Sequence, residues 1–270
     1  KEAISQLDEG AIDLLIAHNI KDLVNVYEYS IPKILVFHNK LTTEIKLGRN
    51  KVNRDDYLIQ INPLLKDVKK VFISESKRRD WGLEGDVILP GIDVTDYGGY
   101  SGDNSSILRV GNLIKERDIM MGFTTSESIL IDLPSHTLGM NPTIIESRLS
   151  SGFDDLLAHY RSFRAYLHTT SNNYEDGYNL ALLEAMAVGM PILSIANNTS
   201  PIKNGINGYI SDDIQYLRSC ALKLLGNQKL AYSLGQKARE TVRDKFSQIK
   251  FLQLWVKSIE ATIIEFLERS

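Results

Sequence analysis

The sequence is poor in several features that would assign its class directly. It holds one cysteine, Cys220, in 270 residues, which excludes an internal disulfide and a cysteine-rich zinc cluster. Its 31 basic and 34 acidic side chains nearly balance, so no basic field indicates nucleic acid as a partner. No uncharged apolar run approaches the roughly 20 residues that a membrane-spanning helix needs. These absences favour a globular protein from a reducing compartment, and we predict a cytoplasmic location.

Several catalytic signatures are missing as well. No G-x-G-x-x-G follows a predicted strand, and there is no G-x-x-x-x-G-K-[ST], no H-E-x-x-H and no G-x-S-x-G. These absences argue against a Rossmann dehydrogenase, a P-loop ATPase, a zincin and an α/β-hydrolase. Asp-x-Asp, a common way of holding a divalent ion against a diphosphate, is also absent. We therefore expect no metal and no cofactor.

What the sequence does contain is an alternation of short apolar runs with stretches of helical period, typical of repeated βα units and a mostly parallel sheet. The predicted strands are Ile12–Ala17, Lys33–Phe37, Val71–Ser74, Val87–Leu89, Ile107–Val110, Ser135–Gly139, Ala165–Thr169, Pro191–Ile195 and Gly208–Ile210. The predicted helices are Asp22–Tyr29, Arg54–Asp67, Glu75–Asp80, Asp118–Leu130, Thr143–Leu149, Asp154–Arg161 and Asn179–Val188, with three more after Asp212. Residues 94–106 are rich in Gly, Ser and Asp without a period, which is typical of a linker. The α/β pattern thus predicts two βα domains that face a cleft.

One segment combines a strand end, a glycine turn and two carboxylates. Strand Ala165–Thr169 is followed by a polar loop, then by Asp176-Gly177, and by a helix from about Asn179. Gly177 permits a tight turn, and the N-terminus of the helix presents N–H groups that favour an anion. Glu184 lies in the second turn of that helix. Asp176 and Glu184 could therefore accept hydrogen bonds from hydroxyls of a ligand whose phosphates bind the helix end.

This segment resembles the GT-B-fold retaining glycosyltransferases of group 1, family 4. Their hallmark is an acidic residue, Gly, an aromatic, a later Glu and an Ala-Met-Ala-x-Gly-x-Pro run. The stretch from Asp176-Gly177-Tyr178 to Glu184 and Pro191 matches it, with Asp in place of the usual first Glu. Segments 107–113, 155–170, 200–210 and 71–93 are similar to other parts of the family, so the resemblance covers most of the chain.

The resemblance implies transfer of a hexose from a nucleotide-diphosphate sugar to a hydroxyl acceptor, with retention at the anomeric carbon and without a metal. Glu184 would bind the ribose of the nucleotide, and His38 would approach the reacting sugar. The resemblance assigns donor binding to Asn112, Gly177, Tyr178, Asn179, Leu180 and Glu184, and catalysis to His38, Lys115, Arg117 and Asp176. The base of the donor stays open between UDP, GDP and ADP, and the acceptor between a glycan, a lipid and a protein.

The resemblance also implies a division of the chain. We predict a shortened acceptor-side domain at 1–93, a linker at 94–106, a donor-binding domain at 107–249, and a helix at 250–270 that packs back on the first domain. The first residues hold neither an initiator Met nor a signal-peptide core, so we expect the chain to begin inside a longer protein. Neither the sequence nor the resemblance gives an oligomeric state.

The chain departs from the family at several positions. Asn112 stands where the family has Arg, Arg117 where it has Lys, and Ile202 where it has Glu. Two alternatives therefore stay open: a weak or inactive sugar-nucleotide-binding module, such as half of a split assembly, and a sugar-nucleotide epimerase. Asp176 has the alternative role of a helix cap, and His18 and His168 are interpreted as core residues at strand ends.

A local basic cluster offers a second kind of partner. Its residues could dock on an anionic lipid or glycan at a membrane surface, although a solvated face is the simpler interpretation. The cluster consists of Lys66, Lys69, Lys70, Lys77, Arg78 and Arg79.

Overall fold

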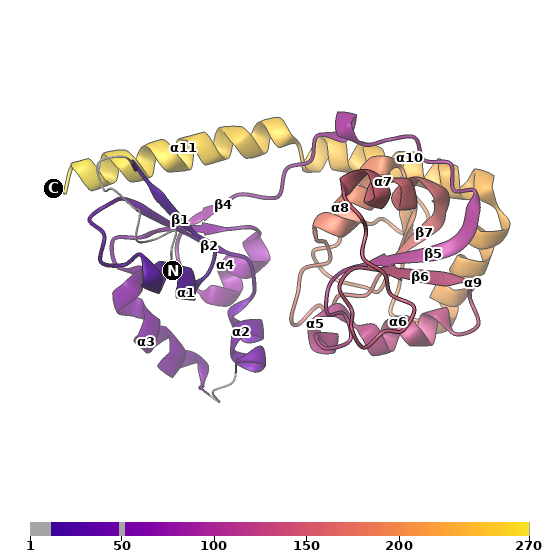
Figure 1. Cartoon of the computed structure of the whole chain (residues 1–270), viewed down its shortest axis with the longest axis horizontal. Coiled ribbons are helices and arrows are strands. Elements are labelled where there is room, and N and C mark those ends of the chain that lie inside the picture. Colours follow the sequence, from indigo (N-terminus) through magenta and orange to yellow (C-terminus); the bar gives the residue numbers. More distant parts are fainter. Residues whose placement is uncertain (1–11, 49–51, 270) are drawn as a thin grey trace. The chain divides into compact units, whose positions relative to one another are not determined.

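The structure is a computed structural model that describes residues 12–48 and 52–269. Contacts divide the chain into two compact units, Lys1–Gly91 with Ile249–Ser270, and Ile92–Gln248. Each unit is an α/β layer structure built on its own parallel sheet (Figure 1). Among the described residues, no helix combines the length and the apolar character needed to cross a membrane.

The first unit has a four-stranded sheet in the order β1-β2-β3-β4, with all neighbours parallel. Its elements are β1 Leu15–Ala17, α1 Ile20–Asn25, β2 Lys33–Phe37, α2 Leu41–Leu47, α3 Arg54–Leu65, β3 Lys69–Phe72, α4 Glu75–Trp81, β4 Asp86–Val87 and α11 Gln248–Leu267. Strand β2 alternates between two cores: Leu35 and Phe37 pack with residues of α1 to α4, and Ile34 and Val36 lie in the other cluster.

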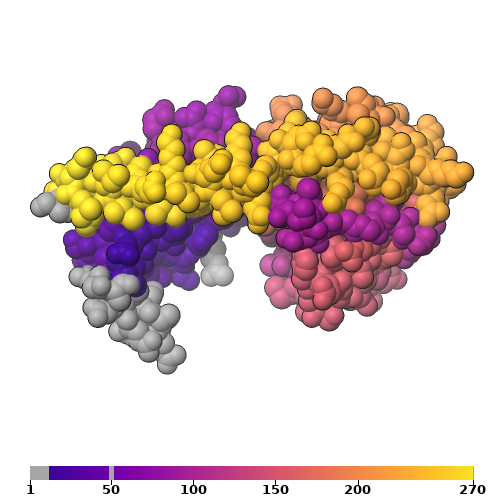
Figure 2. All heavy atoms as spheres, turned by 90° about the horizontal axis from the view of Figure 1, so that it is seen from above, coloured from indigo at the N-terminus to yellow at the C-terminus, as the bar shows by residue number. Residues whose placement is uncertain are grey.

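Helix α11 covers that second face of the sheet. Phe251, Leu254, Trp255 and Ile259 pack against the cluster that contains Ile34 and Val36. Figure 2 shows this helix, in yellow, lying across the indigo residues of the first unit. The apolar side chains of α11 recur at helical spacing, which is why one face of the helix can bury them together.

The second unit has a five-stranded parallel sheet in the order β6-β5-β7-β8-β9. Its elements are η2 Val94–Asp96, β5 Asn104–Val110, α5 Asp118–Met121, α6 Phe123–Leu130, β6 Ser135–Leu138, α7 Phe153–Ser162, β7 Phe163–His168, α8 Leu180–Val188, β8 Ile192–Ser194, β9 Gly208–Ile210, α9 Ile214–Gly226 and α10 Gln228–Lys245. Every residue of β7 is buried, as expected for a central strand covered on both faces. Of the predicted donor-site residues, Asn112 lies in the loop after β5, Gly177, Tyr178 and Asn179 lie in the loop after β7, and Leu180 and Glu184 lie in α8.

The segment predicted as a linker is attached to the second unit. The Tyr100 hydroxyl donates to the Arg164 carbonyl at 2.6 Å, and the N–H groups of Ser101 and Gly102 both donate to the Arg161 carbonyl. Strand β5 begins at Asn104, inside the predicted linker. Hydrogen bonds to β7 and α7 hold most of this segment in place, and most of it forms neither a helix nor a strand. This explains why its sequence shows no helical or strand period.

Two predicted helices differ in the structure. The helix predicted at Asp118–Leu130 is divided at Gly122, whose φ of 62° is left-handed and whose Cβ, if present, would lie 2.1 Å from the Thr169 carbonyl. The helix predicted at Thr143–Leu149 does not form. There the Arg148 backbone bonds with Thr137 and Gly139 at the end of β6 instead.

Candidate functional site

The centre of the predicted site is the turn from β7 into α8. Asn179 caps the helix, because its Oδ1 accepts a hydrogen bond from the Leu182 N–H at 2.9 Å. Gly189 ends the helix in the left-handed conformation, with φ of 100°. The cap is thus Asn179 and not Asp176, which removes the alternative role for Asp176. The positive end of α8 lies at the carboxyl end of β7, where an anion is favoured.

Hydrogen bonds join the loop before α8 to the loop after β8, and we call this contact the clasp. The Gly177 N–H donates to Thr199 Oγ1 at 2.7 Å, and Asn197 Nδ2 donates to the Glu175 carbonyl at 3.1 Å. A Cβ on Gly177 would lie 2.7 Å from the Ser200 nitrogen. Gly177 is therefore required by close approach of two backbones, a role that the sequence motif did not show.

Asp176 is buried within this clasp, with 1% of its surface exposed. Its carbonyl accepts a hydrogen bond from Thr170 Oγ1 at 2.7 Å, and Thr170 Oγ1 lies 2.8 Å from His168 Nε2. Complete burial lowers the pKa of His168 to about 4, so this ring is neutral at pH 7. His168 and Thr170 therefore fix the backbone at Asp176, and His168 is a core residue as predicted.

Glu184 faces two phenols. Tyr160 Oη donates to Glu184 Oε2 at 3.2 Å, and Tyr97 Oη donates to Oε1 at 3.5 Å. Burial raises the pKa of Glu184, although the two phenol hydrogen bonds oppose this change. Burial and the nearby Glu184 carboxylate raise the pKa of Tyr97 to about 12, so its phenol keeps its proton and acts as a donor. Nothing in the sequence motif indicates either contact.

The loop after β5 meets the loop after β6. Asn112 is exposed, and its Oδ1 accepts a hydrogen bond from the Met140 N–H at 2.8 Å. A Cβ on Gly139 would lie 2.1 Å from the Gly111 carbonyl, so the two loops require glycine at this crossing. The Asn112 side chain thus holds the two loops together.

Arg117 lies beside a short helix, α5, that is bonded to the loop between β7 and α8. It directly precedes α5, whose Met120 carbonyl accepts from the Ser171 N–H at 2.8 Å and whose Met121 carbonyl accepts from Thr169 Oγ1 at 2.7 Å. These bonds attach α5 to the loop that follows β7. Arg117 therefore lies next to an element that contacts the loop between β7 and α8.

Lys115 has a different neighbourhood. Its Nζ lies 5.8 Å from the centre of the Phe123 ring, and Lys115 lines an open groove together with Arg109, Glu127 and His136. This groove lies along α6 and the β6 edge of the sheet.

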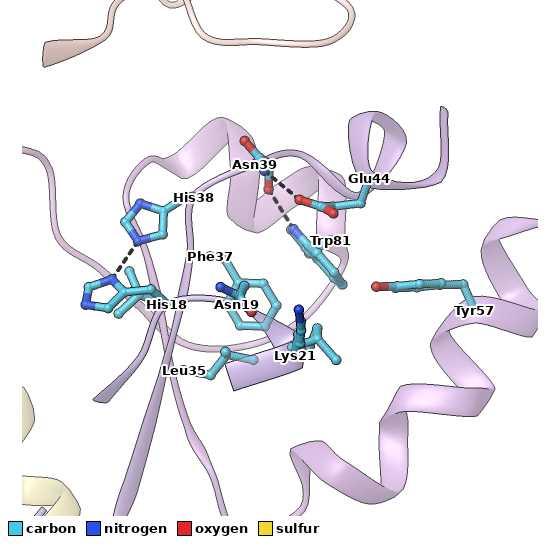
Figure 3. A pocket seen from close by; sticks show the side chains of 12 residues that line it. His18, Asn19, Lys21, Leu35, Phe37, His38, Asn39, Glu44, Tyr57 and Trp81 are labelled. Atoms are coloured by element: carbon cyan, nitrogen blue, oxygen red, sulfur yellow. Dashed lines mark hydrogen bonds between the residues drawn. The ribbon is translucent and has the colours of Figure 1, made fainter. Parts of the chain in front are cut away.

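His38 lies in the first unit, directly after β2 (Figure 3). Its Nε2 is 2.9 Å from Nδ1 of His18, the residue after β1, and the rings stack at 5.2 Å between centroids. Both histidines line a pocket of about 480 Å³, together with Lys21, Glu44 and other residues of the first unit. Partial burial, then His18, then the buried Lys77 lower the pKa of His38. His18, interpreted from the sequence as a core residue, is exposed at this pocket.

The predicted basic cluster does not form a basic surface. Lys77 is 2% exposed, Lys70 Nζ donates to the carbonyls of Leu65 and Val68, and Lys69 pairs with Asp86. Arg78 and Arg79 both pair with Glu75. The cluster is divided because residues 66–70 approach or begin β3 while residues 77–79 lie on the helix that follows it. In the described ranges, no group of three or more His, Cys, Asp or Glu side chains could hold a metal ion.

Comparison with known proteins gives both sequence relatives and structural neighbours. No model of a known protein family matches the chain. The chain is 30% identical over 91 residues to a poly(ribitol-phosphate) α-N-acetylglucosaminyltransferase of Staphylococcus aureus (strain COL), covering 32% of this chain and 18% of that protein. It is 32% identical over 82 residues to an N-acetyl-α-D-glucosaminyl L-malate synthase of Bacillus anthracis, covering 29% and 22%. The matches thus span about a fifth of the length of these relatives.

A solved structure of Anabaena HepE in complex with UDP-glucose superposes with a TM-score of 0.73 at 14% identity, covering 96% of this chain and 82% of HepE. The chain has the GT-B glycosyltransferase fold. The α/β fold class implied by the resemblance is therefore confirmed.

Proposed function

We propose that this GT-B chain binds a nucleotide-diphosphate sugar on its second unit and transfers the sugar to a hydroxyl acceptor. The main support is the β7–α8 turn: a capped helix N-terminus beside an oriented, half-buried carboxylate, Glu184. We also propose UDP as the carrier and N-acetylglucosamine as the sugar. Both sequence relatives are named for N-acetylglucosaminyl products, and HepE was solved with UDP-glucose.

In this proposal the diphosphate binds at the N-terminus of α8, beside Asn179 and Leu180. The helix dipole and Arg117 stabilise the negative charge of the leaving diphosphate without a metal or cofactor. Lys115 contributes less than Arg117, because it lies against Phe123 in the groove along α6. Asn112 closes the loop crossing with its contact to Met140.

Glu184 would accept hydrogen bonds from the ribose hydroxyls. Tyr97 and Tyr160 already donate to its two oxygens, so the carboxylate is oriented before the ligand arrives. Asp176 acts through the backbone around it, because its side chain is 1% exposed. Gly177 and Tyr178 keep that backbone in place, Gly177 by its bond to Thr199 and Tyr178 by packing on Phe246 at 5.2 Å between rings.

We propose retention of configuration, with no protein nucleophile. The bond between the anomeric carbon and the diphosphate breaks, and the acceptor oxygen bonds to the same face of that carbon. The acceptor proton passes to an oxygen of the leaving diphosphate. His38 would contact the sugar during this step, and the protein supplies orientation and charge stabilisation.

One observation favours a second candidate, a donor-binding module without transfer. Asn112 occupies the position of a family cation, and its side-chain oxygen is used by the Met140 N–H. The loss of one cation weakens stabilisation of the leaving diphosphate while leaving Glu184 intact.

Calorimetry with UDP-N-acetylglucosamine, UDP-glucose and GDP-mannose, in EDTA and again in magnesium, followed by an assay for released UDP, tests these proposals. We expect metal-independent binding of a UDP-sugar and slow release of UDP. Glu184→Ala should weaken binding by about ten- to a hundredfold, since a hydrogen bond to a charged group contributes about 1.5–3 kcal/mol. Glu260→Ala, at an exposed position on α11, is the matched control.

Each outcome distinguishes the candidates. Binding without UDP release supports the donor-binding module, and conversion of the donor sugar without UDP release supports an epimerase. If no sugar nucleotide binds, the proposed function is wrong.

A further inference from the structure

The carboxyl ends of β1 and β2 bring two imidazole rings together. Strands β1 and β2 pair in parallel with Ala17 opposite Leu35, and each is followed directly by a histidine. His18 Nδ1 and His38 Nε2 are 2.9 Å apart, which is a hydrogen-bond distance, and the ring planes differ by 27°. The contact joins residues 20 positions apart and depends on the register of the two strands.

A hydrogen bond between two imidazoles requires a particular arrangement of their protons. One nitrogen must carry a hydrogen and the other must offer a lone pair. The pair can therefore hold the bond when both rings are neutral or when one is protonated. A second proton puts N–H groups on both facing nitrogens and breaks the bond.

The surroundings disfavour a positive charge on His38. Lys77 on α4 is 2% exposed, and with His18 it opposes a positive charge on His38. Three other ionisable groups line the same pocket: Lys21 of α1, Glu44 of α2 and Tyr57 of α3. Asn39 Nδ2 donates to Glu44 Oε1 at 2.5 Å on the far side of the pocket from His18 (Figure 3).

We propose that His18 is a positioning residue for His38: their hydrogen bond fixes the plane of the His38 ring, links the tautomer of each ring to that of the other, and leaves Nδ1 of His38 as its one nitrogen for a substrate hydroxyl. The effect on catalysis rests on the proposed function, whereas the fixed orientation of the His38 ring does not. In this proposal the molecule that receives the sugar binds in the pocket of about 480 Å³ beside the pair. The pocket offers it the positive charge of Lys21 and the side-chain oxygens of Asn39 and Glu44, which accept hydrogen bonds.

The two nitrogens of histidine have different isosteres, which makes the test specific. The side-chain amide of Asn lies near the place of Nδ1, and that of Gln near the place of Nε2. His18 uses Nδ1, so His18→Asn keeps a hydrogen-bonding atom for His38, whereas His18→Ala and His18→Gln do not. His136→Asn is the matched control, because His136 packs on His159 and Phe163 in the second unit.

Nitrogen-15 NMR of the histidine rings in the whole chain gives the direct readout. In the wild type we expect a tautomer population of His38 that is set jointly with that of His18. His18→Ala should change this population and raise the pKa of His38, since the opposing ring is gone. His18→Asn should raise the pKa in the same way but keep a tautomer population closer to that of the wild type. The same tautomer population in the wild type and in His18→Ala would overturn the proposal.

UDP release or sugar transfer measures the consequence. His18→Ala should lower turnover about a hundredfold with unchanged donor affinity, since misplacing a reacting group by about 1 Å costs that much. His18→Asn should restore turnover to within about threefold of the wild type. Equal loss in His18→Asn and His18→Ala, with both variants folded, would contradict the positioning role. Absence of turnover in the wild type would contradict the proposed function, and the NMR result still decides whether His18 fixes the ring.

Discussion

The Tyr160 phenol donates a hydrogen bond to the Glu184 carboxylate at 3.2 Å, across the interior of the second unit. Tyr160 lies on α7 and Glu184 on α8, and the two helices pack near β7. Burial raises the pKa of Tyr160 well above its usual range, so the phenol keeps its proton at ordinary pH and acts as a donor. This hydrogen bond therefore holds the Glu184 carboxylate in one orientation, and burying the negative charge costs desolvation free energy.

The first prediction concerns this cost. Burial raises the pKa of Glu184 in the folded protein. The neutral form of Glu184 therefore contributes its full stability at pH values below the pKa that Glu184 has in the unfolded chain. That stability is lost as pH rises through the folded-state pKa. Glu184→Gln removes the charge and keeps an oxygen for Tyr160. We expect the variant to be more stable than the wild type at pH 7, with the two converging near pH 4.

Thermal unfolding from pH 4 to pH 8 measures the difference, and calorimetry with UDP-N-acetylglucosamine should show weaker binding by the same variant. Glu260→Gln, at an exposed site, should follow the wild type at every pH. A variant that is less stable than the wild type at pH 7 would show that the Glu184 charge is stabilised, not strained, by its surroundings.

The second prediction concerns the clasp between the loops after β7 and β8. Gly177→Ala places a Cβ 2.7 Å from the Ser200 nitrogen, so one backbone must move. We expect a loss of about 1–3 kcal/mol in unfolding free energy and a large loss of donor affinity. Gly226→Ala is the control, because its Cβ meets nothing within 4 Å and α9 ends there. Denaturant unfolding of both variants gives the comparison, and equal stability would mean that the clasp opens without cost.

Much of this architecture follows from local sequence pattern, and the rest does not. Strand Lys33–Phe37 was predicted with its observed bounds, because a continuous apolar run is typical of a strand buried on both faces. The helix predicted at Thr143–Leu149 is wrong: Ile145 is fully exposed there, and the Arg148 backbone pairs beside β6. Apolar spacing alone could not show that Arg148 forms an isolated bridge to Leu138 of the edge strand β6.

The site shows the same limit. The motif located Asp176, Gly177 and Glu184, but it could not show the contacts of Glu184 with Tyr97 and Tyr160. Those contacts join residues 87 and 24 positions apart and arise from tertiary packing. The roles of the predicted site residues stay predictions that the variants here are designed to test.

The third prediction concerns the first unit. Trp255 of α11 packs on the face of the sheet that contains Ile34 and Val36. Trp255→Ala should cost about 2 kcal/mol, less than for a fully buried tryptophan because the ring is half-buried. Hydrogen exchange should show faster exchange in β2 and β3 and unchanged exchange in β7. Val256→Ala, at a position 53% exposed, is the control. Equal loss of protection in β7 would mean that the two units unfold together.

The last prediction separates Arg117 and Lys115, the two cations to which the resemblance assigns catalysis. Arg117 precedes α5, which is bonded through Met120 and Met121 to the loop after β7, whereas Lys115 lies against Phe123. Arg117→Met should weaken UDP binding by about ten- to a hundredfold, as expected for the loss of a charge-assisted hydrogen bond. Lys115→Met should change it by less than about threefold, since an exposed charge at longer range is screened. Calorimetry with UDP at two salt concentrations makes the comparison, and the salt dependence should fall in Arg117→Met alone. Because both variants remove one positive charge from the same loop, a larger effect of Lys115→Met would show that the loop rearranges on binding and brings Lys115 to the phosphates.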